Sequence, residues 1–210
     1  MSHIIDGVFI SFEGGEGAGK STQIQMLHDY LKERGLPVVM VRDPGSTDVA
    51  EKIRAILKDT ESIDICTKTE ALLYIAARAQ LACSVIRPYL SKGFVVLCDR
   101  FTHSTMAYQG FGNGLNIEDL QYINNFATSG LVPNITFFLD IDPSEGLRRK
   151  MNQDKLDRIE LKGLEYHEQI ASGFRQLAAG CGHIITIDAA RPKNEIHGTI
   201  ITHIDKFLQS

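Results

Sequence analysis

The sequence lacks three features: an excess of basic residues, paired cysteines and long apolar runs. With 22 Lys and Arg against 26 Asp and Glu, the net charge is −4, so we expect no broad positive surface for DNA or RNA. The four cysteines show no C-x-x-C spacing, and we expect reduced, mostly packed thiols of a cytoplasmic protein. We also expect no signal peptide and no membrane span, because neither a basic stretch followed by an apolar run nor about 18 consecutive apolar residues occurs.

Short apolar segments alternate with helical patterns along the 210 residues. Five apolar segments are expected to form strands: 8–12, 38–41, 94–98, 135–141 and 183–188. The second, 38–41, is expected to be buried like the others. Nearly continuous apolar strands joined by helices are typical of a parallel sheet between two helical layers. Pro88 is expected to end or bend a long helix that begins near residue 67. The length indicates one α/β domain over residues 1–210.

The first strand leads into a glycine-rich loop that is built to hold phosphate. Residues 14–21 read GGEGAGKS and fit the pattern G-x-x-x-x-G-K-[ST], with a strand before and a helix after. Backbone N–H groups and the helix N-terminus would face the phosphates of ATP, Lys20 would reach the β- and γ-phosphates, and Ser21 would hold Mg²⁺. The expected nucleotide-binding residues are Gly14, Gly15, Glu16, Gly17, Ala18, Gly19, Lys20, Ser21 and Thr22.

A second group of residues follows other strands and helices. Asp99 and Arg100 end the third strand; an acid there can reach Mg²⁺ beside the phosphate loop, and a guanidinium suits a second phosphate. Arg42 follows the second strand. Tyr74 and Arg78 lie four residues apart on a helix, where an aromatic ring and a guanidinium on one face can stack on and hydrogen-bond a flat base. The same pair also fits an arginine that covers a core tyrosine.

Taken together and in order, these segments resemble the thymidylate kinase family. The resemblance runs from about residue 7 to the C-terminus and rests on FEGGEGAGKSTQ, RDPGST, YIAARAQ, DRFTHSTMAYQG and LDRIE. It implies a P-loop kinase fold with a five-stranded parallel sheet flanked by helices, in three layers. It also implies transfer of the γ-phosphoryl group of ATP to thymidine monophosphate with Mg²⁺, and a homodimer.

The resemblance also implies roles for individual residues. Tyr74 would stack on thymine and Arg78 would bond the base edge, while Arg42 and Arg100 would bind the acceptor's 5′-phosphate. Three residues would line the base and sugar: Thr105, Tyr108 and Gln109. Arg191 would lie near adenine.

Glu16 places a carboxylate in a loop that binds anions. A carboxylate facing the ATP phosphates would repel them, so we expect the side chain to point to the acceptor's sugar and phosphate region. There it could accept a hydrogen bond from a hydroxyl group and contact Arg42 or Arg100. The hypothesis places Glu16 between the two bound nucleotides.

Residues 147–160, LRRKMNQDKLDRIE, resemble the family's lid and are expected to be mobile. Position 17 is Gly, where other members place an Arg, so the lid must supply the cation that stabilises phosphoryl transfer. Family lids often read R-G-E where this chain has Gln153, Asp154 and Lys155. Arg149 is the first candidate for the cation. Three further candidates follow it: Arg148, Lys150 and Arg158.

Three other functions fit part of the pattern, and an inactive P-loop domain is a fourth alternative. A nucleoside kinase would use Glu16 as a base toward a neutral hydroxyl, but Arg42 and Arg100 are suited to an acceptor that already carries a phosphate. Another nucleotide kinase would share both sites. A switch ATPase would hydrolyse ATP slowly without an acceptor; the N-K-x-D base-reading motif of related GTPases is absent. An inactive P-loop domain would not need both Lys20 and Asp99.

Overall fold

The computed structural model describes residues 7–60, 64–152 and 157–209. Its described residues contain one parallel sheet with the strand order β2-β3-β1-β4-β5. The strands are β1 (Val8–Glu13), β2 (Val38–Arg42), β3 (Val95–Asp99), β4 (Ile135–Asp140) and β5 (Ile184–Asp188). The predicted five-stranded parallel sheet is therefore confirmed.

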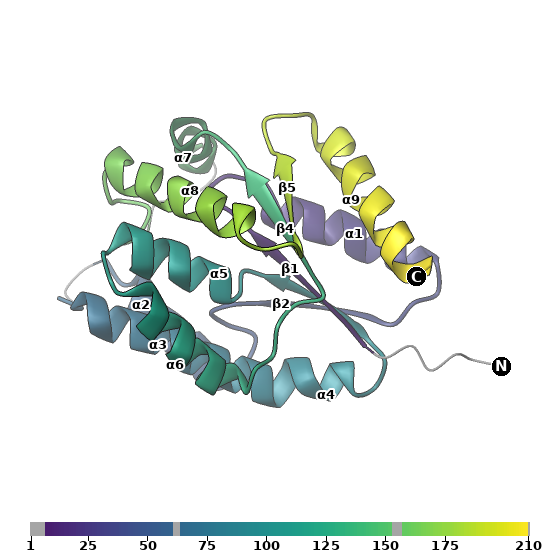
Figure 1. Ribbon diagram of the computed structural model, residues 1–210, viewed down its shortest axis with the longest axis horizontal. Coiled ribbons are helices and arrows are strands. Elements are labelled where there is room, and N and C mark those ends of the chain that lie inside the picture. Colours follow the sequence, from purple (N-terminus) through teal and green to yellow (C-terminus); the bar gives the residue numbers. More distant parts are fainter. Residues whose placement is uncertain (1–6, 61–63, 153–156, 210) are drawn as a thin grey trace.

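Helices cover both faces of the sheet (Figure 1). One face is covered by α1 (Lys20–Glu33) and α9 (Lys193–Gln209), which also pack on each other. The other carries the remaining helices: α2 (Asp48–Lys58), α3 (Thr67–Leu81), α4 (Arg87–Leu90), α5 (Thr102–Thr105), α6 (Ile117–Thr128), α7 (Pro143–Met151) and α8 (Leu164–Ala179). Two π-helical segments, η1 (Ala82–Ile86) and η2 (Met106–Gly112), continue α3 and α5.

The three inner strands are buried along their apolar length, whereas the outer strands are not. In β2, Met40 is 40% exposed and only Val41 is fully buried. The expectation that the second strand is buried was wrong, because apolar composition does not reveal that β2 lies at an edge of the sheet. The helical run that starts at Thr67 ends at Leu90, close to Pro88 as predicted.

The run from Thr67 to Leu90 is long and apolar enough, by length and composition alone, to cross a membrane. It carries Glu70 and Arg78 as buried side chains and packs against α2 and α6, as a helix of the protein's own core does. All four cysteines are free, as expected. Cys66 and Cys83 are exposed, however, so the thiols are not mostly packed.

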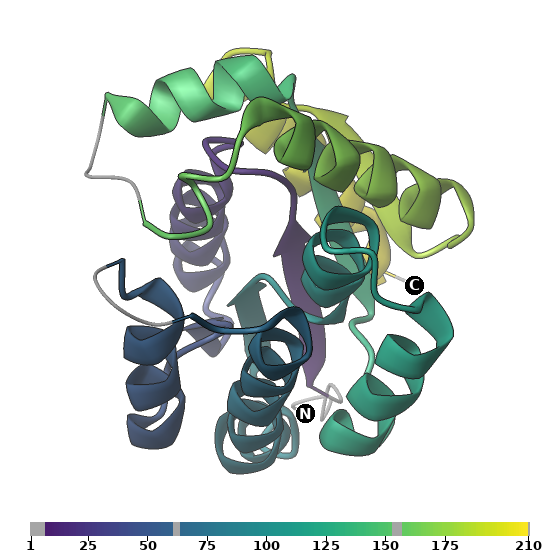
Figure 2. The ribbon, with the colours of Figure 1, turned by 90° about the vertical axis from the view of Figure 1, so that its left-hand side faces the viewer.

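The sheet topology fixes where a ligand can bind. The strands that follow β1 lie first on one side of it, as β2 and β3, and then on the other side, as β4 and β5. Ligands of open α/β sheets bind at such a switch point, beyond the carboxyl ends of the strands. The phosphate loop follows β1 at this point. Figure 2 shows α7 and α2 far apart on this side of the molecule, above and below in the view.

Candidate active site

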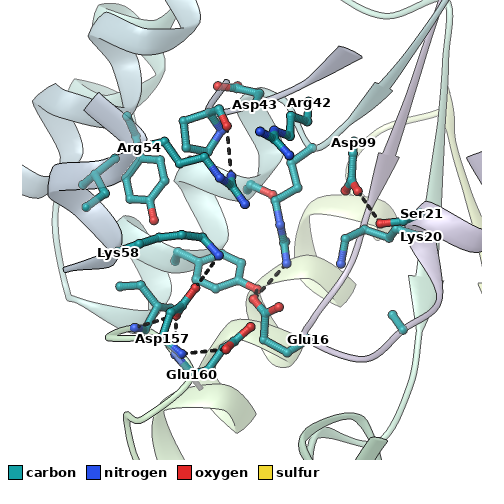
Figure 3. Close-up of a pocket in the computed structure, with 18 of the residues that line it drawn as sticks. Glu16, Lys20, Ser21, Arg42, Asp43, Arg54, Lys58, Asp99, Asp157 and Glu160 are labelled. Atoms are coloured by element: carbon teal, nitrogen blue, oxygen red, sulfur yellow. Dashed lines mark hydrogen bonds and ion pairs between the residues drawn. The ribbon is translucent and has the colours of Figure 1, made fainter. Parts of the chain in front are cut away.

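A pocket of about 290 Å³ lies at the carboxyl ends of the strands, and Figure 3 shows part of its lining. Residues predicted for both nucleotides line this one space: Glu16, Gly17, Ala18, Gly19, Lys20, Ser21, Thr22, Arg42, Tyr74, Arg78, Asp99, Arg100, Thr105, Tyr108 and Gln109. In the figure, Lys20, Ser21 and Asp99 lie on one side, Arg54 and Lys58 lie on the other, and Glu16 lies between them. The two predicted sites are therefore continuous.

The phosphate loop forms as the glycine pattern predicts. Gly14, Gly17 and Gly19 have φ angles of 140°, 66° and 87°, values that other residues rarely adopt. The ammonium of Lys20 donates to the carbonyl oxygens of Gly14 at 3.1 Å and Gly15 at 2.7 Å. Burial, helped by the positive charge of Arg100, lowers the pKa of Lys20 to about 8 although nearby carboxylates oppose the shift. A buried ammonium at the start of α1 is suited to phosphate oxygens.

The loop also packs directly on α7, the helix that leads into the predicted lid. A Cβ atom on Gly17 would lie 2.0 Å from the carbonyl oxygen of Gly146, and one on Gly146 would lie 2.2 Å from the carbonyl oxygen of Glu16. The two backbones are thus in contact, with no room for a side chain at position 17. This contact gives a physical reason for the glycine at position 17.

Ser21 and Asp99 meet at the mouth of the loop. The Ser21 hydroxyl donates to Oδ2 of Asp99 at 2.8 Å, although the two residues come from α1 and β3. Both residues offer oxygen ligands, which Mg²⁺ prefers, and Mg²⁺ commonly binds through one or two protein oxygens together with phosphate oxygens and water. The donor set therefore fits the predicted metal.

The carboxylate of Glu16 contacts residues predicted for the acceptor. Its Oε1 accepts from the Arg100 guanidinium at 2.8 Å and from the Tyr108 hydroxyl at 2.7 Å. Burial raises its pKa, but Arg100, Lys20 and Tyr108 together outweigh burial and lower the pKa of Glu16 to about 2. The predicted contact with Arg100 is confirmed, whereas Arg42 pairs with Glu51 instead.

Arg100 is held by its backbone as well as its side chain. Its φ angle is 71°, in the left-handed region that a non-glycine residue adopts at a cost of about 1–3 kcal/mol. Glu13 secures the following residues by accepting from Phe101 N at 2.8 Å and from the Ser104 hydroxyl at 2.6 Å. The Arg100 guanidinium in turn donates to Gly14 O at 2.8 Å. Sequence reasoning missed Glu13, whose partners lie almost 90 residues away.

Arg78 lies in the interior and is only 1% exposed, so it does not reach over the surface as the alternative interpretation required. Its Nε contacts Oδ2 of Asp43 at 2.5 Å, and its NH1 donates to Thr105 Oγ1 at 2.7 Å and to Asn124. These partners fix the guanidinium at the pocket wall, and Tyr74 lines the same wall. Asp43, the side chain that holds Arg78, lies in the RDPGST segment, and its role was not predicted from the sequence.

Glu70 is a further residue that the sequence analysis missed. Its buried carboxylate accepts from Gln109 at 3.0 Å, from Asn113 at 2.8 Å and from Arg158 at 2.6 Å. Burial is the largest influence on the pKa of Glu70 and raises it, yet Gln109, Lys162 and Arg158 together lower the pKa overall. Glu70 therefore joins α3, the predicted base-lining residue Gln109 and the end of the predicted lid.

The structure places other predicted residues farther from the pocket. Arg149 donates to Glu145 at 2.8 Å and to Ala189 O at 3.2 Å, and it does not line the pocket. Lys150, one of the further candidates, does line it. Arg191 is exposed beside Asp188. Three lid positions singled out in the sequence lie outside the described residues: Gln153, Asp154 and Lys155.

The comparisons with known proteins agree on one family. A thymidylate kinase family model matches residues 12–200. A thymidylate kinase of Finegoldia magna is 43% identical over 92% of this chain and 96% of its own length. One of Geobacillus thermodenitrificans is 43% identical over 95% of this chain and 90% of its own length. The crystal structure of thymidylate kinase from Ehrlichia chaffeensis superposes with a TM-score of 0.76 at 30% identity, covering 94% of this chain and 98% of that one.

Proposed function

The chain belongs to the thymidylate kinase family and phosphorylates thymidine monophosphate with ATP, and we propose that the transfer takes place within the single pocket described above. One observation carries the proposal: the phosphate loop and the Tyr74, Arg78 and Arg100 side chains line one continuous space. Two nucleotides can meet there with their phosphates adjacent, as in-line transfer requires.

The donor occupies the side of the pocket formed by the phosphate loop. The backbone N–H groups of residues 14–21 and the N-terminus of α1 bind the ATP phosphates. Lys20 then exchanges its contacts with two loop carbonyls for phosphate oxygens. Ser21 and Asp99 would hold Mg²⁺, which would neutralise charge on the β- and γ-phosphates. Their oxygen atoms, 2.8 Å apart, support this assignment.

The acceptor occupies the opposite side. Arg100 binds its 5′-phosphate, with Arg42 at the rim, while Tyr74 and Arg78 recognise the base. Thr105, Tyr108 and Gln109 line the space between them. Arg78 is already held by Asp43 at 2.5 Å, so little side-chain entropy is lost when the base binds.

The chemistry needs positioning and charge stabilisation more than a base. The attacking phosphate oxygen is already anionic, so no strong general base is required. The pKa of Glu16, about 2, makes it a poor base toward a neutral hydroxyl. This property disfavours a nucleoside kinase, for which Glu16 was the candidate base. Glu16 instead positions Arg100 and faces the acceptor's sugar.

We further propose a homodimer that works in the cytoplasm. Two large aromatic side chains on α6, Tyr122 and Phe126, are 77% and 81% exposed, and Leu72 on the neighbouring α3 is 53% exposed. Exposed apolar groups on packed neighbouring helices are suited to a subunit interface. Sedimentation of Phe126→Lys against the unmodified chain tests this: the account predicts a monomer for the variant, and an unchanged sedimentation coefficient would contradict it. Four free cysteines support a reducing compartment.

A bisubstrate ligand tests the single-pocket proposal directly. Adenosine and thymidine joined through a 5′,5′-polyphosphate should compete with both ATP and thymidine monophosphate, because one molecule would fill both sides of the pocket. Its affinity should fall in Asp99→Asn and in Arg100→Met alike. Competition with ATP alone would show that the acceptor binds elsewhere.

A further inference from the structure

Three metal-binding side chains come together outside the nucleotide pocket. His103 lies on α5, while Cys181 and His183 flank Gly182 between α8 and β5. One ligand atom from each lies within 4.8 Å of the others, although the chain separates His103 from the other two by almost 80 residues. None of the three lines the nucleotide pocket, and phosphoryl transfer uses none of them.

The cluster is close to the geometry of a tetrahedral metal centre. The Cys181 sulfur lies 3.1 Å from Nδ1 and 3.5 Å from Nε2 of His183, and the rings of His103 and His183 are 5.9 Å apart between centroids. Zn–S and Zn–N bonds at the tetrahedral angle separate ligand atoms by about 3.3–3.6 Å. A side-chain rotation that turns a nitrogen lone pair of His183 into the site, with smaller adjustments of His103 and Cys181, would bring the three ligands to those separations. All three residues are partly exposed, so a metal ion can reach them.

A second observation concerns the other nitrogen of His103. Its Nδ1 is buried without a hydrogen-bond partner among the described residues, and Oε1 of Glu13 lies 4.0 Å away. Histidines that bind metals usually donate their second ring N–H to a carboxylate, which fixes the ring. Ligation through Nε2 would leave Nδ1–H to donate to Glu13. The cluster thus has a carboxylate near the second nitrogen of one of its ligands, and a shift of the ring on metal binding would let the two form a hydrogen bond.

We propose that His103, Cys181 and His183 bind a zinc-type divalent metal ion. One thiolate and two imidazoles suit Zn²⁺, and three protein ligands leave a fourth position for water or an external ligand. Binding replaces the thiol proton of Cys181, which passes to solvent. The bound ion connects the residues just before β5 to α5, which follows Arg100 in the chain. Because it binds only the folded chain, it raises the free energy of unfolding by mass action.

Cobalt titration of the full, metal-free chain tests the proposal. Co²⁺ should bind with a near-ultraviolet band from sulfur-to-metal charge transfer, which oxygen ligands at Ser21 and Asp99 do not produce. Cys181→Ser should lose the band. His103→Asn and His183→Asn should weaken Co²⁺ binding more than tenfold, because loss of a residue that only orients a metal ligand already lowers metal affinity about 10- to 100-fold. The matched controls are Cys83→Ser, an exposed thiol elsewhere, and His197→Asn. Both should bind like the unmodified chain.

Two outcomes would overturn the proposal: a charge-transfer band that persists in Cys181→Ser, or unchanged Co²⁺ affinity in His103→Asn. Melting of each metal-free variant shows whether it folds. If a variant does not fold, the chemical shift of ¹¹³Cd bound to the unmodified chain provides the answer without any substitution. A shift typical of one sulfur and two nitrogen ligands supports the site, and a shift typical of oxygen ligands alone contradicts it.

Discussion

The carboxylate of Glu16 and the guanidinium of Arg100 form an ion pair, with 2.8 Å between Oε1 and NH2 and both side chains 17% exposed. The pair joins the phosphate loop, which binds the donor, to the end of β3, which binds the acceptor. It explains why a loop built for anions carries a carboxylate. The negative charge is paired with an arginine, which weakens its repulsion of the ATP phosphates.

Glu16→Gln should therefore impair use of the acceptor more than binding of ATP. A hydrogen bond between charged groups contributes about 1.5–3 kcal/mol, so kcat/KM for thymidine monophosphate should fall about 10- to 150-fold. Steady-state kinetics with each substrate varied in turn measures the effect, and the Kd for ATP should change less than threefold. An equal loss for both substrates would contradict the assignment of Glu16 to the acceptor side.

Lys20 should set the alkaline limit of activity. Its pKa is lowered to about 8, and kcat/KM for ATP reports groups of the free enzyme. This ratio should fall above pH 8 as the ammonium loses its proton. Between pH 8 and the ordinary lysine pKa of 10.5, the unfolded chain keeps a proton that the folded chain has lost. Lys20 alone therefore makes the free energy of unfolding rise with pH over that window. An alkaline fall centred near pH 10 would contradict the lowered pKa.

Arg149→Ala is expected to lower kcat far more than it weakens ATP binding, if Arg149 supplies the lid cation. In the structure Arg149 contacts Glu145 and Ala189, so it would have to exchange those partners for phosphate oxygens when the substrates bind. Arg148→Ala is the comparison variant, because Arg148 is a further candidate that pairs with the same carboxylate; a larger loss of kcat in Arg148→Ala would assign the role to Arg148. Unchanged kcat in Arg149→Ala with a loss in Lys150→Ala would move the role to Lys150, which already lines the pocket.

Asp43→Asn should be strongly destabilising. It removes the charge that faces buried Arg78, and leaving one member of a buried ion pair alone costs about 3 kcal/mol or more. Asp140→Asn is the surface control, since Asp140 pairs with half-exposed Arg175 and such pairs contribute at most about 1 kcal/mol. Urea unfolding measures both variants. Equal losses of unfolding free energy would show that the Asp43–Arg78 pair adds nothing beyond a surface contact.

Much of the site could be predicted from the sequence because its signals are local. The glycines of the loop require unusual φ angles at fixed spacing, and Lys20 and Ser21 follow them directly. Tyr74 and Arg78 share a helix face because they are four residues apart. Asp99 and Arg100 end a strand, and in a parallel sheet the ends of neighbouring strands meet at one edge.

The residues that the sequence did not reveal act through long-range contacts. Asp43 meets Arg78 across 35 residues and Glu70 meets Arg158 across 88, and no periodic pattern connects such partners. The exposure of Met40 depends on strand order, which apolar composition does not encode. Residues 102–112 form an α-helical turn and a π-helix, which the sequence analysis did not predict because their polar and glycine positions follow no 3.6-residue period.

The most direct test compares thymidine monophosphate with thymidine as acceptor in a coupled assay of ADP release. The account predicts rapid release of ADP with the monophosphate, together with formation of the diphosphate. With thymidine, and with no acceptor at all, the rate should be near background, because Arg100 would then have no acceptor phosphate to hold in line. Phosphorylation of thymidine but not of its monophosphate would contradict the account.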